Sequence, residues 1–143
     1  MAALTVYLDN SVVVPLLLPD ALAGRAEAFL LSAPVGLIVS DFVSAEFASV
    51  VGIRIRTGKL TLTNARAALV NFDLWCGQRT LAAETTTTDV RAAESMLRRL
   101  DLTLRAPDAI NLAIAQRLSA AVATFDEKMA ASADKLGISV LQI

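Results

Sequence analysis

The sequence predicts an α/β protein, a three-layer α/β/α sandwich in which helices cover both faces of a central parallel sheet. Short runs rich in Val, Leu and Ile alternate along the chain with longer segments whose apolar residues have helical spacing. Strands that alternate with helices form parallel sheets, since each crossover helix carries the chain back to the end where the previous strand began. Ligands bind such sheets beyond the carboxyl ends of the strands, so polar residues at these ends are candidate site residues.

The first strand is expected at residues 4–8 and is followed by Asp9, with Ser11 expected to cap the next helix. The other strands are expected at residues 37–39, 81–86, 121–125 and 138–143. The helices are expected at residues 11–18, 20–32, 41–56, 61–77, 89–100 and 107–118, and a last one is capped by Asp126 and ends at Lys135. Pro107 suits the first position of its helix. The buried face of the helix at 89–100 is predicted from Val90, Ala93, Leu97 and Leu100.

Length and hydropathy indicate one domain over residues 1–143 that stays outside the membrane. A chain of 143 residues can bury a core of its own. Pro15 and Pro19 interrupt the densest apolar run, well short of the ~20 residues that a membrane-spanning helix needs. The N-terminal residues lack the basic segment of a signal peptide, so we expect a cytoplasmic protein. The high apolar share of 55% is expected to cover subunit or partner interfaces.

Residue usage excludes several kinds of chemistry. The chain contains no histidine, which removes Ser-His-Asp and Cys-His catalysis and histidine zinc sites. Its single cysteine, Cys76, permits no internal disulfide and is expected to be a partly buried apolar residue. A net charge of −1 argues against nonspecific coating of nucleic acid, although ten of the 13 basic residues are arginine, which suits phosphate recognition. Acid–base or metal chemistry must therefore use Asp and Glu.

Four carboxylates among apolar residues are the candidate catalytic and metal-binding groups: Asp9, Glu46, Asp108 and Asp126. Asp9 and Asp126 each follow an expected strand, and Asp108 lies in the first turn of an expected helix. Buried acids are rare unless they are paired or bound to a cation. Converging carboxylates would repel one another, and a divalent ion held by oxygen ligands relieves that repulsion. The four acids together predict a metal-dependent enzyme.

Taken singly, the four acids differ in how well a structural role explains them. Asp126 is a good helix cap, Asp9 suits a turn, and the helix macrodipole favours any carboxylate at the position of Asp108. Glu46 lies between Val43 and Phe47 on the apolar side of its helix, where a solvated glutamate does not belong. It is therefore expected to be a ligand, with pairing to a buried arginine as the alternative.

Several neighbouring residues are candidates for supporting roles. The hydroxyls of Ser11 and Thr124 could orient a carboxylate or a metal-bound water, although helix capping and strand packing explain them equally well. Asn111 follows Asp108 by about one helical turn, which places an amide on the same face. Arg105 is a candidate for phosphate contacts. For Arg98 and Arg99 a solvated charged surface is the favoured interpretation.

In this order the segments YLDNS, SAEFASV, RAPDAINLAIA and VATFD resemble those of PIN-domain ribonucleases, in particular the VapC-type toxins of bacterial toxin–antitoxin pairs. The resemblance extends from Asp9 to Asp126, so that it covers most of the chain. It implies a PIN-like sandwich whose acidic pocket binds Mg²⁺ or Mn²⁺ and cleaves RNA. The resemblance also assigns residues: the metal-binding carboxylates would be Asp9, Glu46, Asp108 and Asp126, and the accessory hydroxyls Ser11 and Thr124.

The resemblance further implies partners. A toxin of this kind is held inactive by a small antitoxin whose tail lies in a groove near the site, and the apolar helices at 11–32 and 41–57 could form that groove. The family also implies homodimers. Single-stranded RNA is the expected substrate, because its phosphates and bases are accessible.

Four other functions compete with this one. A haloacid-dehalogenase-type phosphatase needs a second Asp where this chain has Ser11. A response-regulator receiver could use Asp41 but needs an acidic pair near the N-terminus that is missing. A non-catalytic PIN-like interaction module and a housekeeping PIN nuclease without an antitoxin stay open as alternatives.

Overall fold

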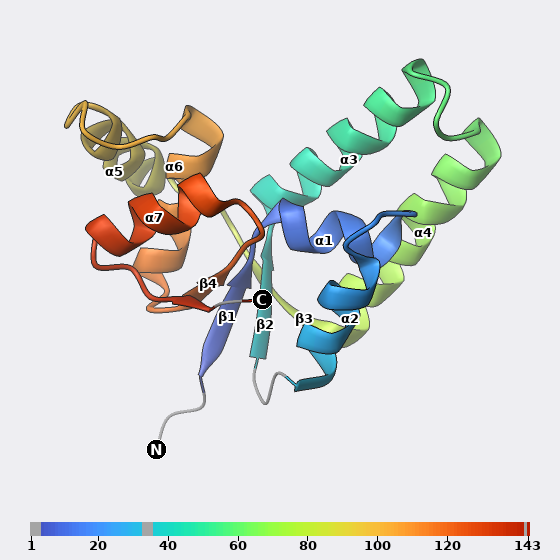
Figure 1. The fold of residues 1–143 in the computed structure, drawn as a ribbon, viewed down its shortest axis with the longest axis horizontal. Coiled ribbons are helices and arrows are strands. Elements are labelled where there is room, and N and C mark those ends of the chain that lie inside the picture. The colour runs from blue at the N-terminus through green and yellow to red at the C-terminus, as the bar shows by residue number, and fades with distance from the viewer. Residues whose placement is uncertain (1–3, 33–35, 142) are drawn as a thin grey trace.

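The computed structural model describes residues 4–32, 36–141 and 143, and it is built around a 5-stranded parallel sheet (Figure 1). The strands are β1 (Thr5–Leu8), β2 (Gly36–Ser40), β3 (Thr80–Ala83), β4 (Ala121–Ala123) and β5 (Val140–Leu141). Their order across the sheet is β3-β2-β1-β4-β5, and every neighbouring pair is parallel. Residue 142 of the last predicted strand, and residues 1–3 of the segment considered for a signal peptide, lie outside the described residues.

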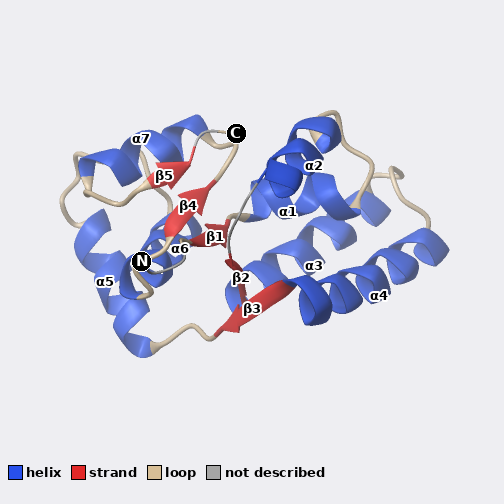
Figure 2. Ribbon diagram, turned by 90° about the horizontal axis from the view of Figure 1, so that it is seen from below, coloured by secondary structure: helices blue, strands red, loops and turns tan. Residues whose placement is uncertain are grey.

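The helices form two groups on opposite faces of the sheet (Figures 1 and 2). The first group consists of α1 (Asn10–Leu17), α2 (Ala23–Ser32), α3 (Asp41–Arg56) and α4 (Leu62–Arg79). The second consists of α5 (Thr87–Leu97), α6 (Ala106–Arg117) and α7 (Glu127–Lys135). The predicted three-layer α/β/α fold is therefore confirmed. Within the described ranges, no helix has the length and apolar character that a transmembrane segment requires.

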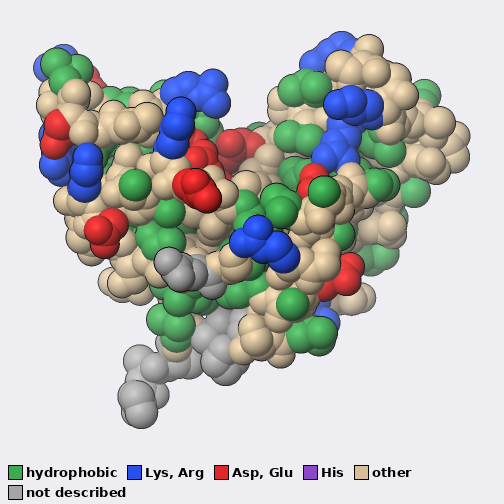
Figure 3. Space-filling model, viewed as in Figure 1, with side chains coloured by type: hydrophobic (Ala, Val, Ile, Leu, Met, Phe, Trp, Pro, Cys, Tyr) green, Lys and Arg blue, Asp and Glu red, His purple; other side chains and the backbone are tan. Residues whose placement is uncertain are grey.

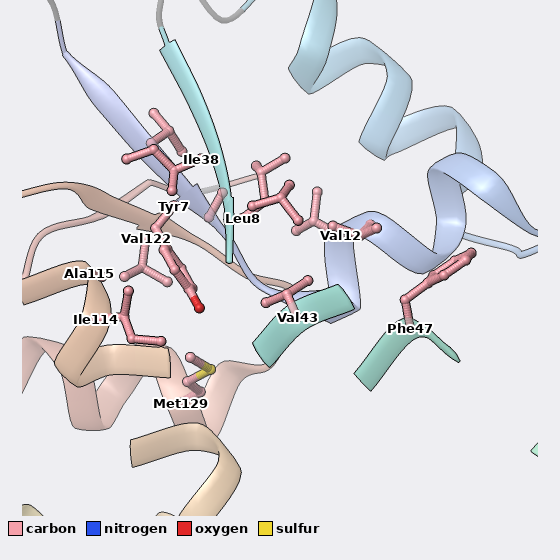
Figure 4. Packing of buried hydrophobic residues seen from close by; sticks show 14 of the residues in the cluster. Tyr7, Leu8, Val12, Ile38, Val43, Phe47, Ile114, Ala115, Val122 and Met129 are labelled. Carbon is pink, nitrogen blue, oxygen red and sulfur yellow. The ribbon is translucent and has the colours of Figure 1, made fainter. Parts of the chain in front are cut away.

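The core lies on both sides of β1, the central strand. Val6, Tyr7 and Leu8 are fully buried, as expected for a strand covered on both faces. On the α1–α4 side, the rings of Phe47 and Phe72 stack at 4.5 Å between centroids and join α3 to α4. Figure 4 shows this core, with Tyr7 among apolar side chains and its hydroxyl directed away from the strand. Cys76 is half-buried against the core, as predicted.

The chain order places a topological switch point between β1 and β4. From β1 the chain moves outward through β2 to β3, then returns to the other side of β1 to form β4 and β5. The crevice beyond the carboxyl ends of the strands at such a point is the usual ligand site of an open α/β sheet. Leu8 pairs with Ala123, so the next residues along the two strands, Asp9 and Thr124, meet there.

Several local predictions were wrong. The cap of α1 is Asp9, whose side chain accepts a hydrogen bond from the Ser11 N–H, so Ser11 lies inside the helix. Helix α6 starts one residue earlier than predicted, at Ala106. Helix α5 buries the predicted Ala93 together with Asp89 and Met96, and Leu97 is partly buried, whereas Val90 and Leu100 are exposed.

Candidate metal site

Asp9 is the most buried carboxylate of the candidate site, with 7% of its surface exposed. One of its oxygens, Oδ2, accepts hydrogen bonds from the Ser11 hydroxyl at 2.7 Å and the Thr124 hydroxyl at 2.9 Å. Ser11 Oγ in turn accepts the Phe125 N–H at 2.9 Å, and Thr124 Oγ1 accepts the Asp126 N–H at 3.0 Å. The two hydroxyls therefore connect Asp9 to the segment that carries Asp126. Thr124, rather than Asp126, directly follows β4.

Glu46 points from α3 toward α6, where the amide of Asn111 donates a hydrogen bond to its Oε1 at 2.8 Å. The other hydrogen-bond acceptor of this amide is the Pro107 carbonyl at 3.0 Å. Burial raises the pKa of Glu46 from 4.5 to about 7, and the charges of Asp9 and Asp108 add to the rise, against the Asn111 hydrogen bond. The charges of acids on two other elements thus act on Glu46.

A fully buried tyrosine fixes the orientation of Asn111. The Tyr7 hydroxyl donates to Asn111 Oδ1 at 2.5 Å, and the Ser40 hydroxyl lies 2.7 Å away. Since the single Tyr7 proton goes to Asn111, Ser40 donates to Tyr7 while its oxygen accepts the Val43 N–H at 3.1 Å. Burial is the main reason that the pKa of Tyr7 is raised, so the hydroxyl stays protonated. These bonds hold the Asn111 amide in the orientation that donates to Glu46.

Sequence reasoning missed Tyr7 and Ser40 as parts of this site. A signal was present, because a tyrosine inside an otherwise apolar buried strand needs a hydrogen-bond partner for its hydroxyl. The partner could not be identified, since Asn111 lies 104 residues further along the chain.

Asp108 and Asp126 both lie at the N-terminal ends of helices, Asp108 as the third residue of α6 and Asp126 as the N-cap of α7. Asp108 Oδ2 accepts the Arg105 N–H at 3.1 Å, and Asp126 Oδ1 accepts the Lys128 N–H at 3.0 Å and the Met129 N–H at 3.1 Å. The expected cap function of Asp126 is confirmed. Burial raises the pKa of Asp108, and the nearby charges of Asp126 and Asp9 act in the same direction.

Each of the four acids uses one oxygen for these contacts. Within the described part of the chain, the other oxygen of each has no hydrogen bond, and none of the four forms an ion pair. Burial, together with the charges of neighbouring acids, raises the pKa of Glu46 and of Asp108 and so disfavours their charged forms. A cation is the group that would compensate them.

A cavity of about 360 Å³ opens beside Asp108 and Asp126. Its walls include Leu102, Leu104 and Arg105 before α6 and Lys128 on α7. Figure 3 shows acidic side chains gathered in the hollow between the two groups of helices, with basic side chains on its rims. The hollow is thus open to a ligand that carries both charged and apolar parts.

The chemistry of these donors fits a divalent ion that prefers oxygen. Carboxylates supply the ligands that Mg²⁺ and Mn²⁺ bind, and the side chains that surround them hold neither histidine nor thiolate. Among the described residues, however, no three acidic, histidine or cysteine side chains are close enough together to hold an ion as they stand. Binding would therefore draw the four carboxylates together from their present positions.

The structure places some of the remaining predicted residues at the site and others on the solvated surface. Ser11, Thr124 and Asn111 contact the acids, and Arg105 lines the cavity. Arg98 pairs with Glu94 and Arg99 with Asp101 on the surface, in agreement with the favoured solvated interpretation.

Comparison with known proteins gives a family match over most of the chain. The PIN domain family model matches residues 6–135. No curated protein matches the chain in sequence.

Solved structures resemble the whole fold at low sequence identity. VapC20 from Mycobacterium tuberculosis, described as a sarcin–ricin loop cleaving toxin, has a TM-score of 0.73 and 20% identity, covering 96% of this chain and 99% of its own. FitAcB from Neisseria gonorrhoeae has a TM-score of 0.67 and 21% identity, covering 96% of each chain. VapBC2 from Rickettsia felis, bound to a promoter DNA fragment, has a TM-score of 0.68 and 14% identity, covering 96% of this chain and 98% of its own. At these identities the likeness shows the fold alone.

Proposed function

The chain belongs to the PIN domain family, and on that basis we propose that it is a metal-dependent endoribonuclease that cleaves single-stranded RNA as the toxin of a toxin–antitoxin pair. The observation that carries the proposal is the set of four acids near the switch point, each with one free oxygen and none with a counter-cation in the described residues. Residues 1–143 would form one nuclease domain, and it would act in the cytoplasm.

In this proposal Asp9, Glu46, Asp108 and Asp126 hold Mg²⁺ or Mn²⁺. When bound, the ion supplies Lewis acidity toward water and the scissile phosphate. Ser11 and Thr124 bind one oxygen of Asp9, and Asn111 binds one oxygen of Glu46, which leaves the other oxygen of each acid for the ion. Hydrolysis by this route needs no histidine, which agrees with the composition.

The proposed partners follow from the similar structures and from the surface. The similar structures include a toxin that cleaves the sarcin–ricin loop and a toxin–antitoxin complex from Klebsiella pneumoniae, which supports RNA as substrate and a small antitoxin as inhibitor. The antitoxin tail would lie along α1, α2 and α3. A homodimer would cover exposed apolar side chains of the α3–β3 region: Ile53, Leu62, Val70, Leu74 and Leu81.

The direct test is RNA cleavage by purified protein. We expect cleavage with Mg²⁺ or Mn²⁺, loss with EDTA, and loss by at least about a hundredfold in Asp9→Asn and Asp108→Asn, because each removes a charged ligand. Asp73→Asn, an exposed acid on α4, is the matched control and should keep full activity. Circular dichroism would verify that each variant is folded. Undiminished cleavage in Asp9→Asn and Asp108→Asn would overturn the metal-site assignment.

A second test separates a toxin from a housekeeping nuclease. Expression should arrest growth, and co-expression of a short adjacent open reading frame should restore it. Cleavage without growth arrest would favour the housekeeping nuclease.

A non-catalytic interaction module is the second candidate. It is favoured by the separation of the acids, since no three of them form a ready metal group in the described structure. RNA binding without cleavage at any tested metal concentration would support this module.

A further inference from the structure

The cavity beside Asp108 and Asp126 has features that a metal site does not require. Its volume, about 360 Å³, falls in the range of roughly 300–1,000 Å³ that is typical of small-molecule sites and far exceeds a single ion. Two leucines and two cations line it together with the two acids. The cavity therefore has room for a larger group next to the acids.

The two cations are fixed to the acids through their own backbone. The N–H of Arg105 donates to Asp108 at 3.1 Å, and the N–H of Lys128 donates to Asp126 at 3.0 Å. Neither cationic side chain forms an ion pair within residues 4–32, 36–141 and 143. Each charged group can therefore reach into solvent or toward a ligand while its attachment point stays close to the acid.

The apolar wall comes from the segment between α5 and α6. Leu102 and Leu104 are partly buried and pack against the core, which fixes the wall in place. Just before them, Arg99 and Asp101 form an ion pair at 3.0 Å. A fixed apolar wall in the same cavity as two cations suits a ligand that has an apolar or sugar part and a phosphate.

We propose that this cavity binds the nucleotide next to the scissile phosphate, with Arg105 and Lys128 contacting its phosphates and Leu102 and Leu104 contacting its ribose or base. The inference rests on the proposed ribonuclease function and adds a substrate subsite to it. Carboxylates repel the RNA backbone, so cations at the margin of the acidic site offset that repulsion for the flanking phosphates. An acidic segment of a protein partner is the competing occupant.

The test measures binding of a fluorescein-labelled, mixed-sequence single-stranded RNA to the full chain by fluorescence anisotropy. Asp9→Asn serves as background so that the RNA is not cut. Adding Arg105→Gln and Lys128→Gln should weaken binding on the order of tenfold and lower the salt slope by about 1.4, since each phosphate contact on a single strand contributes roughly 0.7. Arg91→Gln and Lys59→Gln, which alter exposed cations on α5 and after α3, are the matched controls and should change neither quantity.

Kinetics in the otherwise unchanged protein give a second readout. Arg105→Gln with Lys128→Gln should raise KM for RNA more than it lowers kcat, because the contacts form before the chemical step. If RNA is bound and cleaved but the double variant behaves like the controls, the subsite is wrong while the proposed function stands. The subsite is equally wrong if the double variant loses only inhibition by the antitoxin. If the unchanged protein neither binds nor cleaves RNA, both proposals are wrong.

Discussion

Glu46 is the residue at which burial and charge act most clearly against ionisation. Its pKa rises from 4.5 to about 7 because it is partly buried and lies near Asp9 and Asp108. Between these two values the folded protein keeps a proton that the unfolded chain has released. The stability that this proton contributes is complete below pH 4.5 and is lost as the pH rises through about 7.

We therefore predict that metal-free protein becomes less stable between pH 4.5 and 7, and that Glu46→Gln reduces this dependence. Glutamine keeps an oxygen for the Asn111 amide but cannot ionise. Urea unfolding across this pH range, in EDTA, measures the effect. An equal loss of stability in both proteins would show that Glu46 is not its source.

Replacing Tyr7 tests whether its buried hydrogen bonds stabilise the site. Tyr7→Phe keeps the ring but leaves Asn111 Oδ1 without its donor, so we predict a loss of about 1–3 kcal/mol in the free energy of unfolding. RNA cleavage should also fall, since Asn111 is then free to turn away from Glu46. Ser119→Ala, on the loop after α6, provides a surface control. If Tyr7→Phe were as stable as the wild type, the hydrogen bond from Tyr7 to Asn111 would not stabilise the fold.

At the scale of elements, an ion pair joins α5 to α6. Arg117 donates to both oxygens of Asp89 at 2.8 and 2.9 Å and also to the Glu84 carbonyl. Asp89 is only 1% exposed. Burial acts to raise the pKa of Asp89, but the hydrogen bonds from Arg117 and Thr86 outweigh it and hold the pKa below its usual value. The pair therefore stabilises the fold at neutral pH and less so in acid.

Breaking this pair should be costly because Asp89 would remain buried and charged. We predict that Arg117→Met lowers the free energy of unfolding by roughly 2–3 kcal/mol, less than the roughly 3–5 kcal/mol typical of a fully buried pair, because Arg117 is 35% exposed. Arg98→Met breaks the exposed Arg98–Glu94 pair and should change stability by less than about 0.5 kcal/mol. Urea denaturation compares the two variants. Equal losses of stability in the two variants would show that the Arg117–Asp89 pair contributes no more than an exposed ion pair.

Helices α3 and α5 show why some features could be predicted and others could not. Residues 41–56 were predicted as a helix and form α3, since apolar spacing, the Ser40-Asp41 start and Gly58 agree there. Apolar spacing places Val90 on the buried face of α5, but Val90 is exposed and the neighbouring acid, Asp89, is buried instead. Apolar spacing alone cannot identify an acid that is buried because a distant arginine pairs with it.

The candidate site shows the same division. All four acids follow from local sequence signals, three of them at strand ends or helix starts and Glu46 from the apolar side of its helix. Their separation does not, because it depends on how four elements pack. The Asp9 contacts follow from strand register, which places Thr124 beside it, and register is set by the whole sheet.

At the scale of the whole molecule, the two groups of helices lie on opposite faces of the sheet, touch through the hydrogen bond from Asn111 on α6 to Glu46 on α3, and both contribute acids. Asp9 and Glu46 start or lie within helices of the α1–α4 group, whereas Asp108 and Asp126 start helices of the α5–α7 group. A cation held by all four would connect the two groups. Ion binding should therefore stabilise the entire fold rather than one loop.

We predict that Mn²⁺ at about 100 times its dissociation constant stabilises the protein by about 2.7 kcal/mol and raises Tm by roughly 5–10 °C. Asp108→Asn should lose most of this rise, yet its metal-free form should melt at or above the wild-type temperature, because one repelling charge is gone while the Arg105 N–H keeps an acceptor. Differential scanning calorimetry with and without EDTA measures both changes. Asp73→Asn should respond to Mn²⁺ as the wild type does. If Mn²⁺ raised the Tm of Asp108→Asn as much as that of the wild type, the ion would bind outside the four acids. Neutralising a carboxylate that holds the ion must weaken the connection that the ion makes between the two groups of helices.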